Sequence, residues 1–303
     1  MAEAEDILKK ITKIVEDAAE KFNNKLPSMQ KRVFNELKAL LKDLDVKADK
    51  VSPSVKNLKL IAGINKKLEK IIFDKTYKND LKEYVSAFND ITSLQNQYFA
   101  TLEDSFKPTA LLQQISEEAI EITIDGMNDA IKGAFGQPVR AILQQNITGG
   151  GSYKELMETL SVQGNPDTGS ISANNVKTVT ITAVAQYARN YSHTVAEGLQ
   201  FEWYQYVGST IETTRCFCNA MVKKRFLHKS EVPDILKGEF KEYEDLGCEL
   251  SEKTGLPAGM IKGTNTSNFF TLAGGWNCQH SIFPVPASRV PEDIRTKILN
   301  GLS

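Results

Sequence analysis

Apolar residues recur every three or four positions through most of residues 1–200, which is the period of an α-helix. In the segment 7–22 they are Ile7, Leu8, Ile11, Ile14, Val15, Ala18, Ala19 and Phe22. The same period predicts a helix after Pro27, another over 55–73 and a long one over 77–106. In the helix over 55–73, the residues expected to face inward are Leu58, Ile61, Ile64, Leu68, Ile71 and Ile72. Residues 1–107 are therefore predicted to form a helical leader region.

Residues 108–200 continue the helical pattern with clearer start and stop signals. A helix from Thr109 is expected to end at Gly133 and Gly136, and Pro138 suits the first turn of the next helix. Ser152 and Glu155 have the spacing of a capping box, which predicts a helix start there. The polar segment 161–170 is expected to be a loop, and 176–199 a closely packed helix.

The pattern changes at residue 201. The segment "FEWYQYVG" contains several aromatic residues and ends at Gly208, which favours a β-strand. Short strands, turns, a helix over 230–243 and a closing helix after Ser288 are expected to complete residues 201–303. The predicted fold is thus α+β and predominantly α, with a small C-terminal module of short antiparallel strands.

Composition and charge exclude little. The chain of 303 residues is 41% hydrophobic, and its formal net charge is −1, so the whole chain has no bias toward nucleic acid. Residues 21–70, however, hold thirteen Lys or Arg against five Asp or Glu, a local charge of +8. This basic stretch could contact DNA or form a solvated surface.

The amino terminus lacks the features of a secretory signal, and the sequence has no apolar run long enough to span a membrane. A cytosolic protein with four cysteines is expected to use them as thiols or metal ligands rather than as structural disulfides.

Three of these cysteines and one histidine lie in two short motifs. Cys216 and Cys218 form a C-x-C pair, and Cys278 and His280 form a C-x-H pair, which together offer the four donors of a tetrahedral zinc site. The alternatives are a disulfide between Cys218 and Cys278, buried apolar thiols, or a cysteine nucleophile beside a histidine. Cys248 is isolated in the sequence and is expected to be an ordinary thiol. The residues suggest either no cofactor or a zinc ion.

The two motifs together resemble a known family. "WYQYVGSTIETTRCFCNAMVKKRF", followed much later by "GGWNCQHSIFPV", is similar to the phage Mu F-like head morphogenesis family of minor capsid proteins. The matching positions are Trp203, Tyr206, Gly208, Thr214, Arg215, Phe217, Cys218, Gly274, Gly275, Asn277, Cys278 and His280. A weaker likeness in "ILQQNITGGGSYKELMETLS" extends the resemblance to about residues 110–290. Two positions depart from the family pattern, because Cys216 stands where proline is frequent and Gln279 where arginine is frequent.

The residue types of the motif have an evident physical role. Arg215 offers a planar set of donors that could hold a carboxylate or several backbone carbonyls, while Gly274 and Gly275 permit a tight return of the chain. Together they would hold two distant segments against each other. The apolar interior of the module is expected to come from Trp203, Phe217 and Trp276.

The resemblance implies a structural, non-enzymatic minor head protein of a tailed bacteriophage. Such a protein would be located in the virion and act in head assembly near the portal protein and other capsid proteins. A contact with packaged DNA through residues 21–70 is a further expectation. The alternative is a zinc-dependent nuclease or a host-directed toxin carried in the phage head, since Cys/His-rich modules can support such chemistry.

Overall fold

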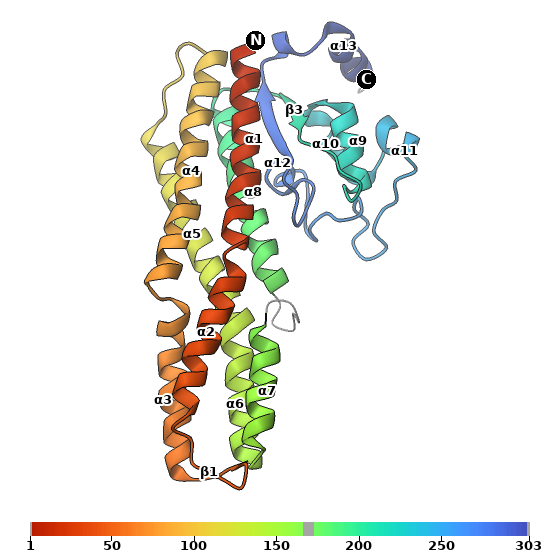
Figure 1. Cartoon of the computed structure of the whole chain (residues 1–303). Coiled ribbons are helices and arrows are strands. Elements are labelled where there is room, and N and C mark those ends of the chain that lie inside the picture. Colours follow the sequence, from red (N-terminus) through yellow and green to blue (C-terminus); the bar gives the residue numbers. More distant parts are fainter. Residues whose placement is uncertain (1, 166–172, 302–303) are drawn as a thin grey trace. The chain divides into compact units, whose positions relative to one another are not determined.

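The predicted fold class is confirmed by the computed structural model, which describes residues 2–165 and 173–301 and is mainly helical with short antiparallel strands (Figure 1). The chain divides into two compact units. The first comprises Met1–Ala19, Ser86–Glu121 and Ile181–Ser303, and the second comprises Glu20–Val85 and Ile122–Thr180. The longest helices are α1 (Ala2–Asn23), α4 (Lys75–Leu102), α5 (Ala110–Ile131) and α8 (Ala173–Gly198).

These units do not coincide with the ranges 1–107, 108–200 and 201–303 expected from the sequence. Each unit is assembled from separate stretches of chain, and the boundaries at 19/20, 85/86, 121/122 and 180/181 all fall inside a long helix. Because an amphipathic pattern continues through a helix without a break, the sequence gives no signal at such a boundary.

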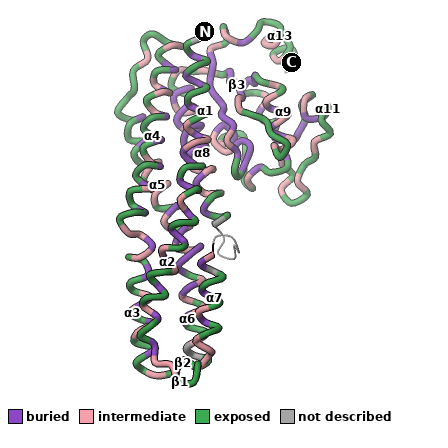
Figure 2. The backbone as a smooth tube through the Cα atoms, in the orientation of Figure 1, coloured by how far each residue is buried: buried purple, intermediate pink, exposed green. Residues whose placement is uncertain are grey.

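The second unit contains a four-helix arrangement of α2 (Leu26–Leu41), α3 (Val55–Ile72), α6 (Gln137–Gly149) and α7 (Tyr153–Gly164). These helices run side by side, with α2 packed against α3 and α7, and α6 packed against the same two helices (Figure 1). Their buried faces alternate with exposed ones along each helix (Figure 2). The helical period read from the sequence therefore identifies most of the inward-facing residues, although Leu58 is half exposed rather than buried.

A short hairpin closes one end of this unit. It consists of β1 (Val46–Lys47) and β2 (Lys50–Val51), joined through Ala48 and Asp49, both of which have positive φ. The backbone of Asp49 accepts a hydrogen bond from the N–H of Tyr153, and its carboxylate accepts one from the Ser152 hydroxyl at 2.6 Å. Ser152 also accepts a hydrogen bond from the N–H of Glu155, so the helix begins where predicted and the Ser152 half of the capping box is present.

Two helix predictions are corrected. Gly133 and Gly136 do not end a helix, because the chain continues from α5 into α6 through a π-helical segment, Lys132–Gly136. The helix expected over 230–243 is interrupted at Gly238, which adopts a left-handed conformation and separates α10 (Val232–Lys237) from α11 (Lys241–Asp245). Within the predicted loop 161–170, α7 extends to Gly164, and residues 166–170 lie outside the described part of the chain.

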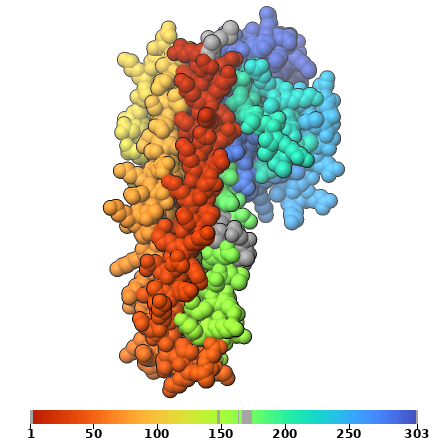
Figure 3. All heavy atoms as spheres, viewed as in Figure 1, coloured from red at the N-terminus to blue at the C-terminus, as the bar shows by residue number. Residues whose placement is uncertain are grey.

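In the first unit, polar side chains connect the helices to the C-terminal region. Gln95 of α4 donates hydrogen bonds to the Ala188 carbonyl and the Ser192 hydroxyl of α8, and Tyr98 donates to the carbonyl of Pro284 at 2.8 Å. Tyr98 and Gln95 are fully buried, so these bonds satisfy groups that water cannot reach. In the space-filling view, the atoms of neighbouring helices within each unit meet on the visible face (Figure 3).

The C-terminal region is built on a three-stranded antiparallel sheet of order β4-β3-β5. The strands are β3 (Trp203–Val207), β4 (Phe226–His228) and β5 (Ser281–Val285), and Trp203 lies opposite both His228 and Val285. The short helices are α9 (Cys216–Lys224), α10, α11, α12 (Phe269–Leu272) and α13 (Glu292–Gly301), with 3-10 turns at Lys229–Glu231 and Ala287–Arg289. The aromatic strand predicted from the sequence is therefore the central strand.

Candidate functional site

Arg215, immediately before α9, joins the two motif segments. Its guanidinium donates hydrogen bonds to the backbone carbonyls of Gly274 and Trp276. The side chain also lies against Gly259, where a Cβ would overlap it. Segments about sixty residues apart in sequence are thus held together by one planar donor group.

The return turn beneath Arg215 depends on two glycines. Gly274 has φ +79°, and a Cβ there would overlap the Cys278 sulfur. Gly275 has φ +75°, and a Cβ there would overlap the carbonyl oxygen of Gly259. Asn277 also has positive φ, +60°, and its N–H donates to the Thr182 hydroxyl at 3.1 Å. The turn therefore requires the backbone freedom of glycine at the two adjacent positions.

This turn brings two cysteines and a histidine together. The sulfur of Cys218, on the first turn of α9, lies 3.8 Å from the sulfur of Cys278, which in turn lies 3.6 Å from Nδ1 of His280. A donor atom from each of the three residues lies within 4.8 Å of the other two. The three residues are only 2%, 3% and 8% exposed, so the cluster is buried.

Aromatic and cationic groups surround this Cys218–Cys278–His280 cluster. The ring of Tyr206, a fully buried residue of β3, stacks on the His280 ring, and its hydroxyl lies 3.7 Å from the Cys278 sulfur. The hydrogen bond with Cys278, together with burial, holds the pKa of Cys218 well above its usual range. The same hydrogen bond, reinforced by His280 and the nearby Arg189, lowers the pKa of Cys278 against the effect of burial. Negative charge in the cluster is therefore best accommodated on Cys278.

Arg189 is the functional residue that the sequence analysis missed. It lies on α8, is 1% exposed, and donates hydrogen bonds to the carbonyls of Ala273 at 2.7 Å and His280 at 3.2 Å. Its Nε and Nη2 atoms have no hydrogen-bond partner within the described residues. The sequence did contain one signal, a single arginine among the small and apolar residues of 176–199. An arginine in a closely packed helix is expected to be buried, and a buried guanidinium requires acceptors or negative charge nearby.

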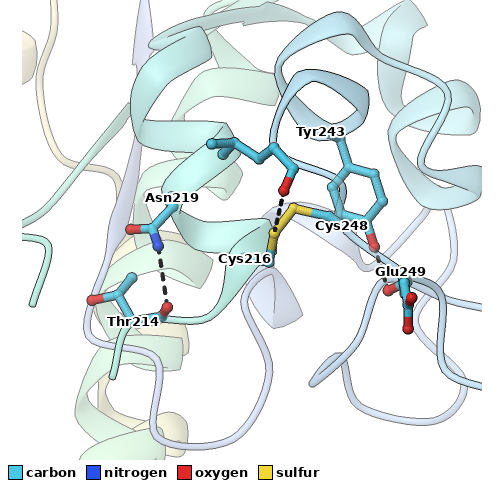
Figure 4. Close-up of a disulfide and its surroundings, with 7 residues drawn as sticks. Thr214, Cys216, Asn219, Tyr243, Cys248 and Glu249 are labelled. Atoms are coloured by element: carbon cyan, nitrogen blue, oxygen red, sulfur yellow. Dashed lines mark hydrogen bonds between the residues drawn. A yellow bond between two sulfur atoms is a disulfide. The ribbon is translucent and has the colours of Figure 1, made fainter. Parts of the chain in front are cut away.

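The grouping of Cys216 with the zinc donors is corrected by the structure. Cys216 forms a disulfide with Cys248, 32 residues along the chain, and Cys248 is accordingly not an isolated thiol (Figure 4). Figure 4 shows this bond between the start of α9 and the turn that follows α11. Cys218 and Cys278, in contrast, are free thiols, so the disulfide considered between them is absent. The two cysteines of the C-x-C pair thus have different partners, because residues two positions apart lie on roughly opposite sides of a helix.

The remaining motif residues have separate roles. Phe217 belongs to the main core of the C-terminal region, while Trp203 packs with Phe226, Val285 and Val290 in a smaller core cluster. The prediction that Trp276 contributes to the interior is wrong, because its side chain is 49% exposed. Its backbone carbonyl, rather than its ring, contacts Arg215.

Two further motif residues set the local geometry of the site. Gly208 leaves room for the His280 ring, which a Cβ at that position would overlap. Thr214 accepts a hydrogen bond from the N–H of Ile211 through its hydroxyl, and one from the Asn219 side chain through its carbonyl (Figure 4). These contacts fix the backbone on either side of Arg215.

No family model, curated protein or solved structure matches this chain. Among the described residues, no helix has the length and apolar character needed to cross a membrane. The site's chemistry is therefore read from its own atoms. A buried set of two sulfurs and an imidazole, held by an arginine and a glycine turn, can bind a soft metal ion or cross-link two segments structurally.

Proposed function

We propose that the protein is a structural minor head protein of a tailed bacteriophage, located in the virion and acting in head assembly beside the portal and other capsid proteins. The observation that carries this proposal is the junction of the two family-like motif segments through Arg215 and the carbonyls of Gly274 and Trp276. The motif residues serve to build one rigid block from distant parts of the chain. Such a block suits a protein whose task is to present a fixed surface to other proteins.

A structural role also accords with the burial of the chemically reactive groups. Cys218, Cys278 and His280 are each less than one-tenth exposed, so a macromolecular substrate would have to displace packed side chains to reach them. We therefore propose that the protein is not an enzyme. The competing possibility of a zinc-dependent nuclease or toxin would require hydrolysis of nucleic acid that disappears with the Cys278→Ser variant.

The virion proposal is tested by inducing particles from the genome that encodes this chain and analysing purified heads by quantitative mass spectrometry. The protein is expected in the particles at low copy number relative to the major capsid protein. A strain carrying Arg215→Ala should yield heads that lack the protein, whereas Lys262→Ala, at an exposed site in the same region, should leave incorporation unchanged. Absence of the wild-type protein from purified heads would overturn the proposal.

The basic stretch 21–70 supports a proposed contact with packaged DNA. Of its thirteen basic residues, eleven lysines are exposed. The stretch spans α2, the hairpin and α3, all within the second unit. Lys59, Lys66 and Lys67 on α3 are among the exposed residues. Binding through such lysines should be electrostatic and independent of sequence.

Filter retention of double-stranded DNA at 50 and 200 mM salt tests this contact. Affinity is expected to fall by about 10-fold or more over this range, because each neutralised phosphate releases counterions. The triple variant Lys59→Glu/Lys66→Glu/Lys67→Glu should weaken binding and its salt dependence. The matched variant Lys223→Glu/Lys253→Glu/Lys262→Glu alters the net charge by the same amount outside the stretch, and it should leave DNA binding unchanged. Retention that does not change with salt would contradict a DNA contact of this kind.

A further inference from the structure

The Cys218–Cys278–His280 cluster has the dimensions of a metal site and not only of a packed core. A tetrahedral zinc ion with Zn–S bonds of about 2.3 Å and a Zn–N bond of about 2.0 Å requires its sulfurs to lie roughly 3.8 Å apart and each sulfur to lie roughly 3.6 Å from the nitrogen. The Cys218 and Cys278 sulfurs are 3.8 Å apart, and the Cys278 sulfur is 3.6 Å from Nδ1 of His280. Two of the three separations thus match a tetrahedral zinc site, and all three donor atoms lie within 4.8 Å of one another. From this grouping we infer that Cys218, Cys278 and His280 bind one zinc ion.

Tyr206 is the fourth group of this site. Its hydroxyl faces the same space, 3.7 Å from the Cys278 sulfur, and its ring is held in place by stacking on His280. Charge balance favours the phenolate as the fourth ligand. Binding of Zn²⁺ would release the protons of both thiols and of the phenol to solvent. The three negative charges left on the ligands would be neutralised together by Zn²⁺ and the buried guanidinium of Arg189. The zinc site thus also accounts for a buried arginine that lacks a carboxylate partner within the described residues.

The elements that supply the ligands are independently fixed. Cys218 lies on α9, Tyr206 on β3, and Cys278 and His280 on the segment that leads into β5. Arg189 donates to the His280 carbonyl, and Arg215 holds the turn before Cys278. The donors are thereby positioned before an ion arrives, which reduces the entropy lost on binding.

A groove of about 570 Å³ in the first unit shares one residue, Gly208, with the surroundings of the cluster. It is lined by residues of α1, including Leu8 and Thr12, and by Val207, Gly208 and Ser209 after β3. The Cδ2 edge of the His280 ring, next to Nε2, lies against Gly208. The Nε2 atom has no hydrogen-bond partner within the described residues. When Nδ1 binds the ion, Nε2 carries the ring proton at this edge.

The inference goes beyond the proposed function, because zinc binding would hold whatever assembly the protein enters. The inference also assigns different roles to the two pairs of cysteines. Cys216 and Cys248 form the disulfide, and Cys218 and Cys278 remain available as thiolates. A zinc ion would join α9 to the segment before β5 where Arg215 already joins their backbones.

The material for the test is the full chain, purified anaerobically without an affinity tag, chelators or a reductant, so that the Cys216–Cys248 disulfide stays intact. Elemental analysis after exposure to ZnCl₂ and gel filtration is expected to find about one zinc per chain. Cys278→Ser and Cys218→Ser should each lose the ion. Tyr206→Phe should still bind zinc, but with an affinity reduced by about 10-fold or more. The matched control is Cys216→Ser/Cys248→Ser, which removes two sulfurs but should keep one zinc per chain.

Cobalt substitution and a donor exchange keep the test decisive if a serine variant fails to fold. Wild-type protein loaded with Co²⁺ should show the strong visible absorption of tetrahedral cobalt with thiolate ligands, and His280→Cys should keep the metal with a shifted spectrum. The inference is overturned if folded wild-type protein binds no zinc, if Cys278→Ser retains it, or if the protein mass shows a disulfide between Cys218 and Cys278. Zinc content is measured on isolated protein, so its failure is distinguishable from failure to enter phage heads.

Discussion

In the bundle of α2, α3, α6 and α7, apolar side chains repeat along every helix, whereas the region 201–303 is held together by a few specific contacts. The bundle relies on repeated apolar contacts, and Leu37, Leu41 and Leu68 are each buried. The C-terminal region uses a glycine turn, an arginine held by two carbonyls, a disulfide and a buried thiol cluster. In the bundle, therefore, many residues each contribute a small part of the stability. In the C-terminal region, a few contacts contribute most of it.

The contrast follows from the length of regular structure available. A helix of sixteen or eighteen residues, such as α2 or α3, satisfies its own backbone and needs only one apolar face. The C-terminal helices α10, α11 and α12 have six, five and four residues, and the strands have three to five. Elements this short cannot persist alone, so contacts between distant segments must hold them.

The largest effect is expected from Gly275→Ala. The added methyl group would overlap the Gly259 carbonyl, and the alanine would have to adopt a positive φ. Together these effects should lower the free energy of unfolding by about 4 kcal/mol. Gly247→Ala is the matched control, because Gly247 also has positive φ but has open space at its Cβ, and it should cost only about 1 kcal/mol. Urea unfolding followed by circular dichroism measures both. Equal losses would show that backbone conformation alone, not the close approach, limits this turn.

The disulfide should have the next largest effect. It closes a segment of 32 residues, and its removal in Cys216→Ser/Cys248→Ser should cost about 3.5 kcal/mol through the entropy of the unfolded chain. Amide hydrogen exchange is the measurement, with faster exchange expected in α9 and α11 and no change in α3. If exchange were also faster throughout α3, the disulfide would stabilise the bundle as much as the C-terminal region, and the contrast between the two regions would be wrong.

A core truncation in the bundle should be somewhat milder. Leu68 is fully buried in α3, and Leu68→Ala should cost about 3 kcal/mol by leaving a cavity. Leu58→Ala on the same helix removes a half-exposed side chain and should change stability by less than about 0.5 kcal/mol. Thermal unfolding of the two variants compares them. If Leu58→Ala proved as harmful as Leu68→Ala, the assignment of the buried face of α3 would be wrong.

The smallest effect is a dependence on pH through His193 of α8. Burial beside Phe270 and Tyr204 lowers its pKa, and Glu197 only partly opposes this shift. The unfolded chain therefore binds a proton more readily, so stability should decline as the pH falls below about 6.5, the ordinary histidine value. His193→Gln should flatten this part of the profile of unfolding midpoint against pH. An unchanged slope in the variant would assign the decline to other groups.

The helical fold was accessible from sequence because periodicity is a local property. The apolar stripe of 7–22, the cap at Ser152 and the aromatic strand at 203–207 all depend on residues close together in the chain. The same reasoning failed at Gly133 and Gly136, because glycine is compatible with a π-helical turn as well as with a helix end. It also failed for Leu58. This residue belongs to the apolar stripe of its helix, but the part of the helix that is buried is narrower than that stripe.

The candidate site was only partly predictable. Residue types alone placed Cys218, Cys278 and His280 together, but nothing local distinguishes Cys216 from Cys218 as a donor. That choice depends on where the turn after α11 brings Cys248, which is a tertiary property. Arg189 was missed for the same reason, since its partners lie 84 and 91 residues away.

The division of the chain into discontinuous stretches bears on its synthesis. The first unit needs residues 1–19, 86–121 and 181–303, so its opening segment cannot complete its packing until residues 181–303 have left the ribosome. The second unit can complete once residue 180 has emerged. Synthesis at roughly 5–20 residues per second would give the bundle a head start of several seconds. During that interval the apolar side of residues 1–19 is without its final neighbours, a period in which a chaperone could bind it.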